Sequence, residues 1–187
     1  MKKGLFVGSF NPITLAHERI ANDLMETLDY LYYLPVNSKK VDLVAIPDRI
    51  NMINLIINKN QSVLNILKYS KDGLFNINIL NKLNLDITHI IMGSDLFFKF
   101  NTFKNYQEIL DKYYLIVIKR ELNRDINEYL DKYYLKYKDK IIFIDKEYDG
   151  SSTKALENLK KKENKYLNKK VLDYIIKNNL YNITKSA

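Results

Sequence analysis

The chain has 187 residues, of which 47% are apolar and 12% aromatic, so it holds enough apolar material for a substantial core and is not a disordered chain. It contains no cysteine, which excludes disulfides, thiolate metal sites and a thiol nucleophile. The net charge of +8 comes from lysines spread through the sequence, which indicates a solvated basic surface, with attraction of polyphosphate substrates as the functional alternative. Without an arginine-rich stripe, the pattern disfavours nucleic acid.

Short apolar runs alternate with amphipathic segments along the whole chain. The runs that predict strands are Leu5–Val7, Tyr30–Leu34, Ser62–Leu67, His89–Met92, Leu115–Ile118 and Ile141–Ile144. The segments that predict helices are His17–Leu28, Arg49–Asn58, Phe75–Leu83, Tyr106–Leu110, Ile126–Tyr134, Ser152–Lys162 and Lys169–Asn178. This alternation predicts an α/β fold, a Rossmann-like doubly wound parallel sheet. We expect a single domain over residues 1–187, with a C-terminal helical part at about 151–181.

The segment Gly8–His17 is predicted to form a tight turn between the first strand and the first helix. Such a turn gathers backbone N–H groups and the positive end of a helix dipole at one place, which suits a phosphate group. It follows the first strand, so it is expected at the carboxyl edge of the sheet, where ligands bind in doubly wound folds. The usual nucleotide fingerprints, G-x-G-x-x-G and G-x-x-x-x-G-K-[ST], are both missing from the sequence.

The motif Gly8-Ser9-Phe10-Asn11-Pro12-Ile13-Thr14-Leu15-Ala16-His17 resembles the signature of nucleotidyltransferases with a (His/Thr)-x-x-His motif. The resemblance is greatest to nicotinate/nicotinamide mononucleotide adenylyltransferases. It places Thr14 and His17 at the two motif positions, with Ala16 where the family usually has glycine. It implies that His17 stabilises the α- or β-phosphate of ATP and that Thr14 positions a phosphate oxygen. It also assigns the Gly8-Ser9-Phe10 stretch to ATP.

A second motif, Gly150-Ser151-Ser152-Thr153-Lys154, resembles the family's Ser-Ser-Thr motif before a C-terminal helix. The resemblance implies that Ser152, Thr153 and Lys154 hold the β- and γ-phosphates, and hydroxyl and N–H groups at a helix N-terminus suit triphosphate oxygens. Taken alone, the same residues are also a plain helix cap. Leu156 stands where the family normally has an arginine, so triphosphate affinity depends on a substitute cation such as Lys154 or Lys160.

A third segment, His89-Ile90-Ile91-Met92-Gly93-Ser94-Asp95-Leu96, resembles the family's strand that ends in Gly-x-Asp. The resemblance assigns Gly93 and Asp95 to ATP. Arg120, at the end of the fifth apolar run, falls where the family often has an arginine near the phosphates. His89 begins a strand between Thr88 and Ile90, and we expect it to be structural.

The mononucleotide is assigned by the same resemblance to residues scattered along the chain. These residues are Asn11, Lys39, Lys40, Asn76 and Phe103. Lys39 and Lys40 lie in the loop after the second run, with exposed lysines as the alternative reading. Phe103 falls where the family usually places a tryptophan that stacks on the pyridine ring; ordinary packing is the alternative.

The implied activity is adenylyl transfer from ATP to nicotinate mononucleotide, or nicotinamide mononucleotide, which gives a dinucleotide and pyrophosphate in NAD biosynthesis. Mg²⁺ would accompany ATP, and no residue is assigned to it. The expected partners are these small molecules, with no nucleic acid and no membrane, and the oligomeric state stays open, a homo-oligomer included. With no secretory signal pattern at the start of the sequence, we expect a cytoplasmic location.

Three other functions remain open from the sequence. A pantetheine-phosphate adenylyltransferase would use another acceptor on the same machinery, although those enzymes are typically shorter. Cytidylyltransferases usually have a histidine where Thr14 stands. A degenerate nucleotide-binding homologue with a regulatory role is the alternative that Leu156 supports best.

Overall fold

The computed structural model of the protein describes residues 1–38, 43–119 and 125–183. Its centre is a six-stranded sheet in the order β3-β2-β1-β4-β5-β6, in which every neighbouring pair is parallel. The strands are β1 (Lys3–Gly8), β2 (Tyr30–Pro35), β3 (Gln61–Val63), β4 (His89–Gly93), β5 (Tyr114–Ile118) and β6 (Ile141–Ile144). The strand order reverses between β1 and β4, so the predicted doubly wound parallel sheet is confirmed.

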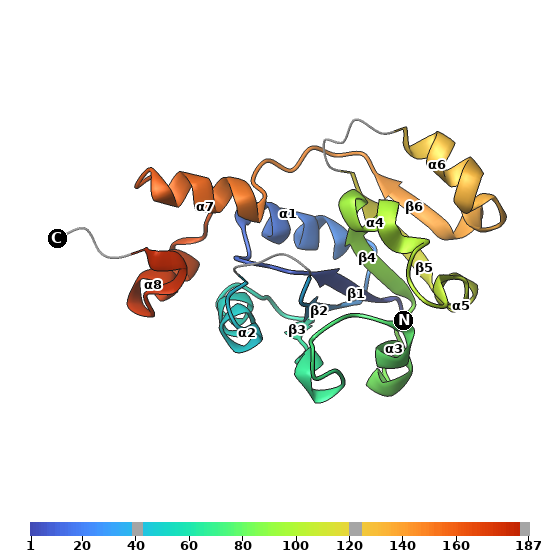
Figure 1. Cartoon of the computed structure of the whole chain (residues 1–187), viewed down its shortest axis with the longest axis horizontal. Coiled ribbons are helices and arrows are strands. Elements are labelled where there is room, and N and C mark those ends of the chain that lie inside the picture. The colour runs from blue at the N-terminus through green and yellow to red at the C-terminus, as the bar shows by residue number, and fades with distance from the viewer. Residues whose placement is uncertain (39–42, 120–124, 184–187) are drawn as a thin grey trace.

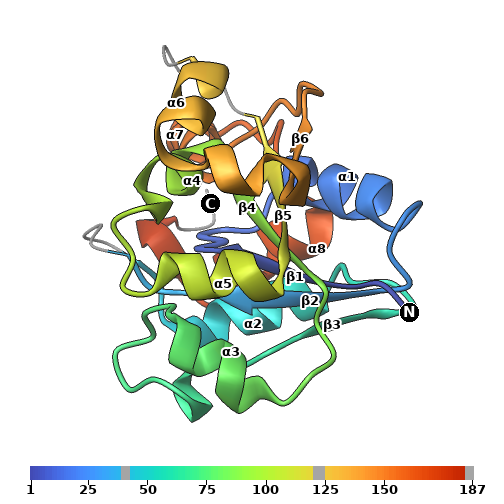
Figure 2. The same ribbon diagram turned by 90° about the vertical axis from the view of Figure 1, so that its right-hand side faces the viewer.

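Helices cover both faces of this sheet (Figures 1 and 2). The α-helices are α1 (Leu15–Leu24), α2 (Ile46–Asn54), α3 (Ile77–Leu83), α4 (Ser94–Phe100), α5 (Tyr106–Lys112), α6 (Ile126–Tyr133), α7 (Ser152–Lys160) and α8 (Lys169–Lys177). Short 3-10 helices form at η1 (Ile66–Lys68), η2 (Leu135–Lys140) and η3 (Leu180–Asn182). None of the helices within the described ranges combines the length and apolar character that crossing a membrane requires.

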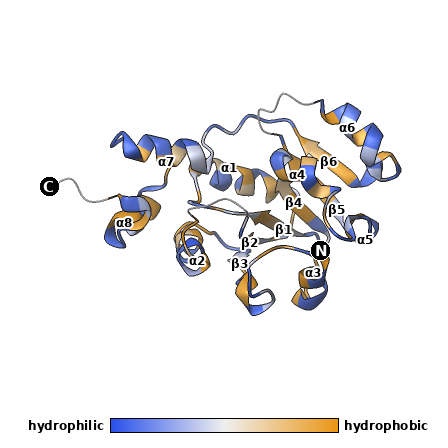
Figure 3. Cartoon of the chain, viewed as in Figure 1, coloured by the Kyte–Doolittle hydropathy of each residue, from blue (hydrophilic) through white to orange (hydrophobic). Residues whose placement is uncertain are grey.

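The strands divide the core into two apolar layers. Leu5, Ile90 and Leu115 face a layer that α3, α4, α5 and α6 complete, whereas Phe6 and Ile91 face a layer completed by α1, α7 and α8. Successive residues of a strand point to opposite faces, so strands buried on both sides are apolar at nearly every position. Figure 3 shows this pattern as apolar strands between helices that carry one apolar side.

The structure departs from the prediction at one strand, which is shorter, and at one helix, which the sequence analysis did not predict. The third strand was expected over Ser62–Leu67, but pairing ends at Val63, because the Asn65 side chain accepts a hydrogen bond from the Leu67 N–H and starts η1. Helix α4 was not predicted at all. It begins immediately after β4, with Gly93 as its N-cap, so only the short segment Gly93-Ser94-Asp95 separates the apolar residues of the strand from those of the helix.

Candidate active site

The turn between β1 and α1 lies at the carboxyl edge of the sheet, next to the point where the strand order reverses. Phe10 adopts a left-handed conformation with φ of 45°, and the Asn11–Pro12 peptide bond is cis. A bulky residue with positive φ is uncommon and costs conformational energy, and such residues concentrate at functional sites. The turn then ends at Thr14, the N-cap of α1.

Thr14 and His17 form a reciprocal cap at the start of α1. The Thr14 N–H donates to Nδ1 of His17 at 3.1 Å, and the Thr14 hydroxyl oxygen lies 2.8 Å from the same nitrogen. Nδ1 therefore faces Thr14, and Nε2 is the nitrogen on the opposite edge of the ring. Both residues are buried, with Thr14 1% and His17 5% exposed, and the Phe10 ring packs edge-on against the imidazole at 5.2 Å between centroids. His17 is therefore held in one orientation by Thr14 and Phe10.

The second motif joins the first directly. The Thr14 hydroxyl donates to the Gly150 carbonyl at 2.7 Å, and the Ser152 hydroxyl donates to the Pro12 carbonyl at 2.8 Å. Ser151 caps α7 by accepting from the Lys154 N–H at 3.2 Å. The N-termini of α1 and α7 therefore meet at one place, and one hydroxyl from each motif holds them together.

Gly150 is the position in this junction that only glycine fits, and its substitution is the first test of the geometry. Its φ is +113°, and an added Cβ would lie 2.8 Å from Cδ1 of Tyr166. We expect Gly150→Ala to lower the free energy of unfolding by about 1–3 kcal/mol and to reduce turnover, because the Gly150 carbonyl anchors Thr14. Thermal unfolding and turnover measure the two effects, and an unchanged melting temperature would contradict the steric conflict.

A pocket of about 300 Å³ opens beside this junction. Its walls come from α1, the start of α4, the end of β5 and the segment that leads into α7. The lining residues are Ala16, His17, Ile20, Asp95, Ile118, Lys119, Glu147, Tyr148, Asp149, Gly150, Ser151, Thr153 and Lys154. Its volume lies at the lower end of the range for small-molecule sites, and its polar groups converge on His17.

Three of the charged groups that line the pocket, Asp149, Lys154 and Lys119, form ion pairs. Asp149 accepts from Lys165 at 3.3 Å and from Lys154 at 3.5 Å, and these hydrogen bonds, that of Lys165 foremost, lower the pKa of its carboxyl. Lys119 contacts Asp145 at 2.6 Å. These lysines are exposed, so a more highly charged anion in the pocket competes for them at little cost.

Tyr148 forms one wall of the pocket from the segment before Gly150. Its hydroxyl donates to Asp23 of α1 at 2.6 Å, and burial, followed by the contact with Asp23, raises the pKa of the Tyr148 hydroxyl. The ring is thus fixed beside the pocket as a neutral group. Neither Tyr148 nor Asp149 was predicted from the sequence, although both directly precede the second motif.

On the β2 side of the turn, Arg49 of α2 is fully buried at 0% exposure. Its Nη1 donates to the carbonyls of Ser9 and Val36, both at 2.8 Å, and Nη2 donates to Oδ1 of Asn37 at 2.5 Å. Burial lowers the pKa of the Arg49 guanidinium. Arg49 thereby joins the end of β1 to the loop after β2.

Asn11 lies on the same side and is 9% exposed. Its Oδ1 accepts from the Val44 N–H at 3.0 Å and from the Tyr181 hydroxyl at 2.9 Å. The C-terminal turn η3 therefore reaches the first motif. The sequence carried no signal for Tyr181, because its contact with Asn11 spans 170 positions.

The other predicted residues are placed as follows. Gly93 is the buried N-cap of α4, and Asp95 is exposed in its first turn, at the pocket. Asn76 caps α3 by accepting from the Asn78 N–H at 3.0 Å, and Phe103 packs on Phe100 with 5.6 Å between ring centroids. Neither Asn76 nor Phe103 is among the residues that line the pocket at His17. Lys39, Lys40 and Arg120 lie outside the described residues.

His89 lies at the other end of the sheet, at the first residue of β4. Its Nδ1 is 2.7 Å from the Thr88 hydroxyl oxygen, and its ring stacks on Tyr114 with 5.2 Å between centroids. This is the setting of a structural histidine.

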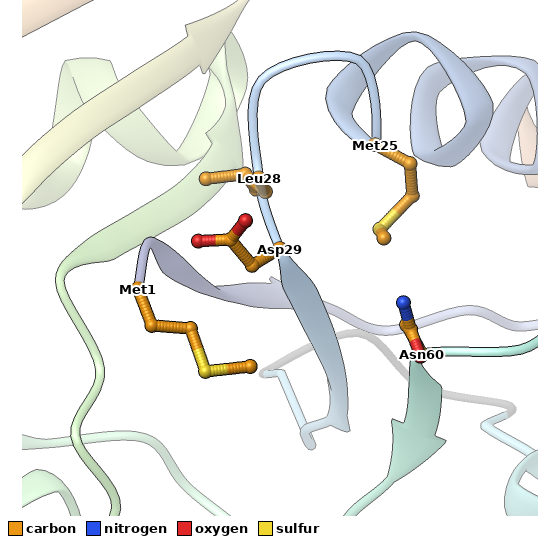
Figure 4. Close-up of a pocket in the computed structure, with 5 residues that line it drawn as sticks. All are labelled: Met1, Met25, Leu28, Asp29 and Asn60. Carbon is orange, nitrogen blue, oxygen red and sulfur yellow. The ribbon is translucent and has the colours of Figure 1, made fainter.

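A second hollow, of about 620 Å³, also lies at the amino edge (Figure 4). Its lining residues are Met1, Met25, Leu28, Asp29 and Asn60. The Asp29 carboxylate accepts from the Lys2 N–H at 2.6 Å, and these five side chains supply no hydroxyl and no cation. The donors that suit phosphate gather at the opposite edge, so we place the candidate site there.

Comparisons of the sequence with a family model and with known proteins agree on one family. A family model described as cytidylyltransferase-like matches residues 5–158. A protein of Endomicrobium trichonymphae named "probable nicotinate-nucleotide adenylyltransferase" is 30% identical, over 96% of this chain and 98% of that protein. A protein of Acholeplasma laidlawii with the same name is 30% identical, over 95% of this chain and 96% of that protein.

Solved structures support the fold. The nicotinic acid mononucleotide adenylyltransferase of Plasmodium falciparum, solved with NaAD, aligns with a TM-score of 0.78 and 24% identity, over 98% of this chain and 99% of that one. At that identity the likeness speaks for the architecture alone. The family model and the sequence relatives show that the chain belongs to the nicotinate-nucleotide adenylyltransferase branch of the cytidylyltransferase-like family.

Proposed function

We propose that the protein is a nicotinate-nucleotide adenylyltransferase that joins ATP and nicotinate mononucleotide in NAD biosynthesis. An oxygen of the mononucleotide 5′-phosphate forms a bond to the α-phosphorus of ATP. The bond from that phosphorus to the oxygen that bridges it to the β-phosphate breaks, and its electron pair leaves with pyrophosphate. The attacking phosphate is already an anion at neutral pH, so no general base is needed. The site has to align the two phosphates and stabilise the charge that develops between them.

The observation that carries the proposal is the orientation of His17 at the junction of α1 and α7. Nδ1 contacts Thr14, His17 lines the pocket, and we assign Nε2 as the nitrogen that donates to the phosphate. A fixed donor at a helix N-terminus suits a phosphate oxygen that gains charge in the transition state. We assign His17 to the α- or β-phosphate, and Thr14 to holding His17 and the Gly150 segment in place.

We assign the β- and γ-phosphates to the N-terminus of α7. Thr153 and Lys154 line the pocket. The Lys154 ammonium is paired with the Asp149 carboxylate, and a phosphate group would replace that partner. The Ser152 hydroxyl already donates to the Pro12 carbonyl, so this residue contributes its backbone N–H. Leu156 packs against the apolar layer that α1 completes. Lys154 is the lysine of α7 that lines the pocket, so we assign the role of the family's arginine to Lys154.

Magnesium enters with ATP as part of the substrate. Among the residues that the structure describes, no group of three or more His, Asp or Glu side chains forms a metal site. The pocket supplies hydroxyl, imidazole and ammonium groups that suit phosphate oxygens, which fits an ion held mainly by the phosphates. Such an ion neutralises phosphate charge.

The mononucleotide is proposed for the β2 side of the turn, where Asn11 lies across the first motif from the ATP pocket. Dinucleotide-type folds bind their two halves on either side of the strand-order reversal. Lys39, Lys40, Asn76 and Phe103 remain predicted contacts for this substrate.

A direct test is pyrophosphate release from MgATP with nicotinate mononucleotide, nicotinamide mononucleotide and phosphopantetheine offered in parallel. We expect the fastest release with nicotinate mononucleotide. Release with phosphopantetheine alone would move the protein to the pantetheine-phosphate branch. No release with any acceptor, from a folded protein that binds ATP, would favour a regulatory homologue.

A further inference from the structure

We propose that Tyr181 is a positioning residue for the mononucleotide, which acts by fixing the side-chain amide of Asn11. The inference rests on the proposed function, because it concerns the second substrate of that reaction. It makes the C-terminal turn η3 part of the active site.

The hydrogen bond from the Tyr181 hydroxyl helps to fix the orientation of the Asn11 side-chain amide. Oδ1 of Asn11 accepts two hydrogen bonds, from the Val44 N–H at 3.0 Å and from the Tyr181 hydroxyl at 2.9 Å. An amide carbonyl oxygen accepts two bonds well, whereas the amide nitrogen accepts none, so both donors favour the same orientation. Removing one donor weakens this preference. A neutral hydrogen bond of this kind changes an equilibrium constant, here that between the two orientations of the Asn11 amide, by about fivefold to tenfold.

The Tyr181 hydroxyl is suited to remain a donor. Its burial raises the pKa of the hydroxyl above its ordinary value, so the group stays protonated at neutral pH. Tyr181 itself adopts a left-handed conformation with φ of 57°, between Asn179 and Asn182, which are also left-handed. Asparagine tolerates this region, but a tyrosine there carries strain that surrounding contacts must offset.

The residues that hold Asn11 and its neighbours in place lie on the side of the turn proposed for the mononucleotide and not at the ATP pocket. Arg49 lies beside Tyr181 and ties Ser9 to the loop after β2, at Val36. Thus Tyr181, Asn11 and Arg49 all hold the β2 side of the turn. The ATP pocket is lined instead by residues of α1, α4, β5 and the start of α7.

A second tyrosine provides a matched control. The Tyr174 hydroxyl of α8 contacts Asp48 and Asn51 of α2, each at 2.9 Å. Like Tyr181, Tyr174 belongs to the C-terminal region, and its hydroxyl holds α8 against α2. The Tyr174 hydroxyl bonds to α2 and not to Asn11, so its loss perturbs docking and leaves the Asn11 amide with both donors.

The experiment compares Tyr181→Phe with Tyr174→Phe in steady-state pyrophosphate release, with each substrate varied at saturating concentration of the other. We expect Tyr181→Phe to raise the KM for nicotinate mononucleotide about fivefold to tenfold, with kcat and the KM for ATP changed by less than about twofold. Tyr174→Phe should leave both KM values near those of the wild type. In an Asn11→Ala background, Tyr181→Phe should have no further effect on the mononucleotide KM.

The outcomes separate this inference from the proposed function. An active wild type whose mononucleotide KM is unchanged by Tyr181→Phe would overturn the positioning role alone. So would an equal rise in both KM values, or the same rise in Tyr174→Phe, because either result would mean that the tyrosine only stabilises the fold. A wild type that releases no pyrophosphate with any acceptor contradicts the proposed function, and this inference with it.

Discussion

Replacing His17 by alanine is expected to lower kcat for pyrophosphate release about a hundredfold or more, the usual effect of removing one transition-state donor. Thr14 contacts Nδ1, and Nε2 is the nitrogen that the proposed function assigns as the donor to the phosphate. Alanine removes that donor from a buried position that water does not readily fill, since His17 is only 5% exposed. The KM for ATP should change much less than kcat, because the donor acts on charge that develops during transfer.

Two variants make the test specific. His17→Gln keeps an N–H donor on a side chain of similar reach and should retain more activity than His17→Ala. His89→Gln changes the structural histidine at the amino edge of β4 and should leave kcat within about twofold of the wild type. A His17→Ala enzyme within a few-fold of the wild type would refute the role assigned to His17.

Replacing Arg49 by methionine is expected to lower the free energy of unfolding by about 3–5 kcal/mol. Methionine fills much of the same space but donates no hydrogen bond, so three acceptors, one buried and two partly buried, lose their donor: the carbonyls of Val36 and Ser9 and Oδ1 of Asn37. Arg49→Lys should recover only part of the loss, because one ammonium lacks the planar fork that reaches all three. The pyrophosphate assay should also show lower activity, since the first motif loses its tie to the loop after β2.

Urea unfolding followed by circular dichroism measures this effect as a lower midpoint. Arg19→Met is the matched control, because Arg19 is exposed on α1, and it should change the free energy of unfolding by less than about 0.5 kcal/mol. Equal midpoints for Arg49→Met and the wild type would show that the buried hydrogen bonds contribute no net stability.

Much of the fold follows from local pattern. Strand runs such as Leu5–Val7 and Leu115–Ile118 are apolar throughout because helices cover both faces, and this signal is visible in the sequence. The end of β3 is not visible in the same way. The apolar run continues past Val63, and only the side-chain hydrogen bond of Asn65 turns the chain away from the sheet. For the same reason α4 was missed: Gly93 separates a strand and a helix that are apolar alike.

The candidate site was predictable where its chemistry lies in one short segment. The turn around Thr14 and His17 has the hydroxyl, imidazole and helix N-terminus that the sequence indicated. The pairing of that turn with the second motif could not be derived from spacing, because the Thr14–Gly150 contact joins residues 136 positions apart. The use of the Ser152 hydroxyl to bind the Pro12 carbonyl depends on the same packing.

That long-range junction also bears on how the enzyme comes into being on the ribosome. Thr14 and His17 are synthesised before the Gly150 carbonyl that anchors Thr14, which follows 136 positions later. At about 5–20 residues per second, the turn exists for about 7–27 seconds before its partner segment is made. A chain interrupted anywhere in that interval carries the signature motif yet lacks the anchor of Thr14, so the junction of the two motifs forms only after residue 150 has been added.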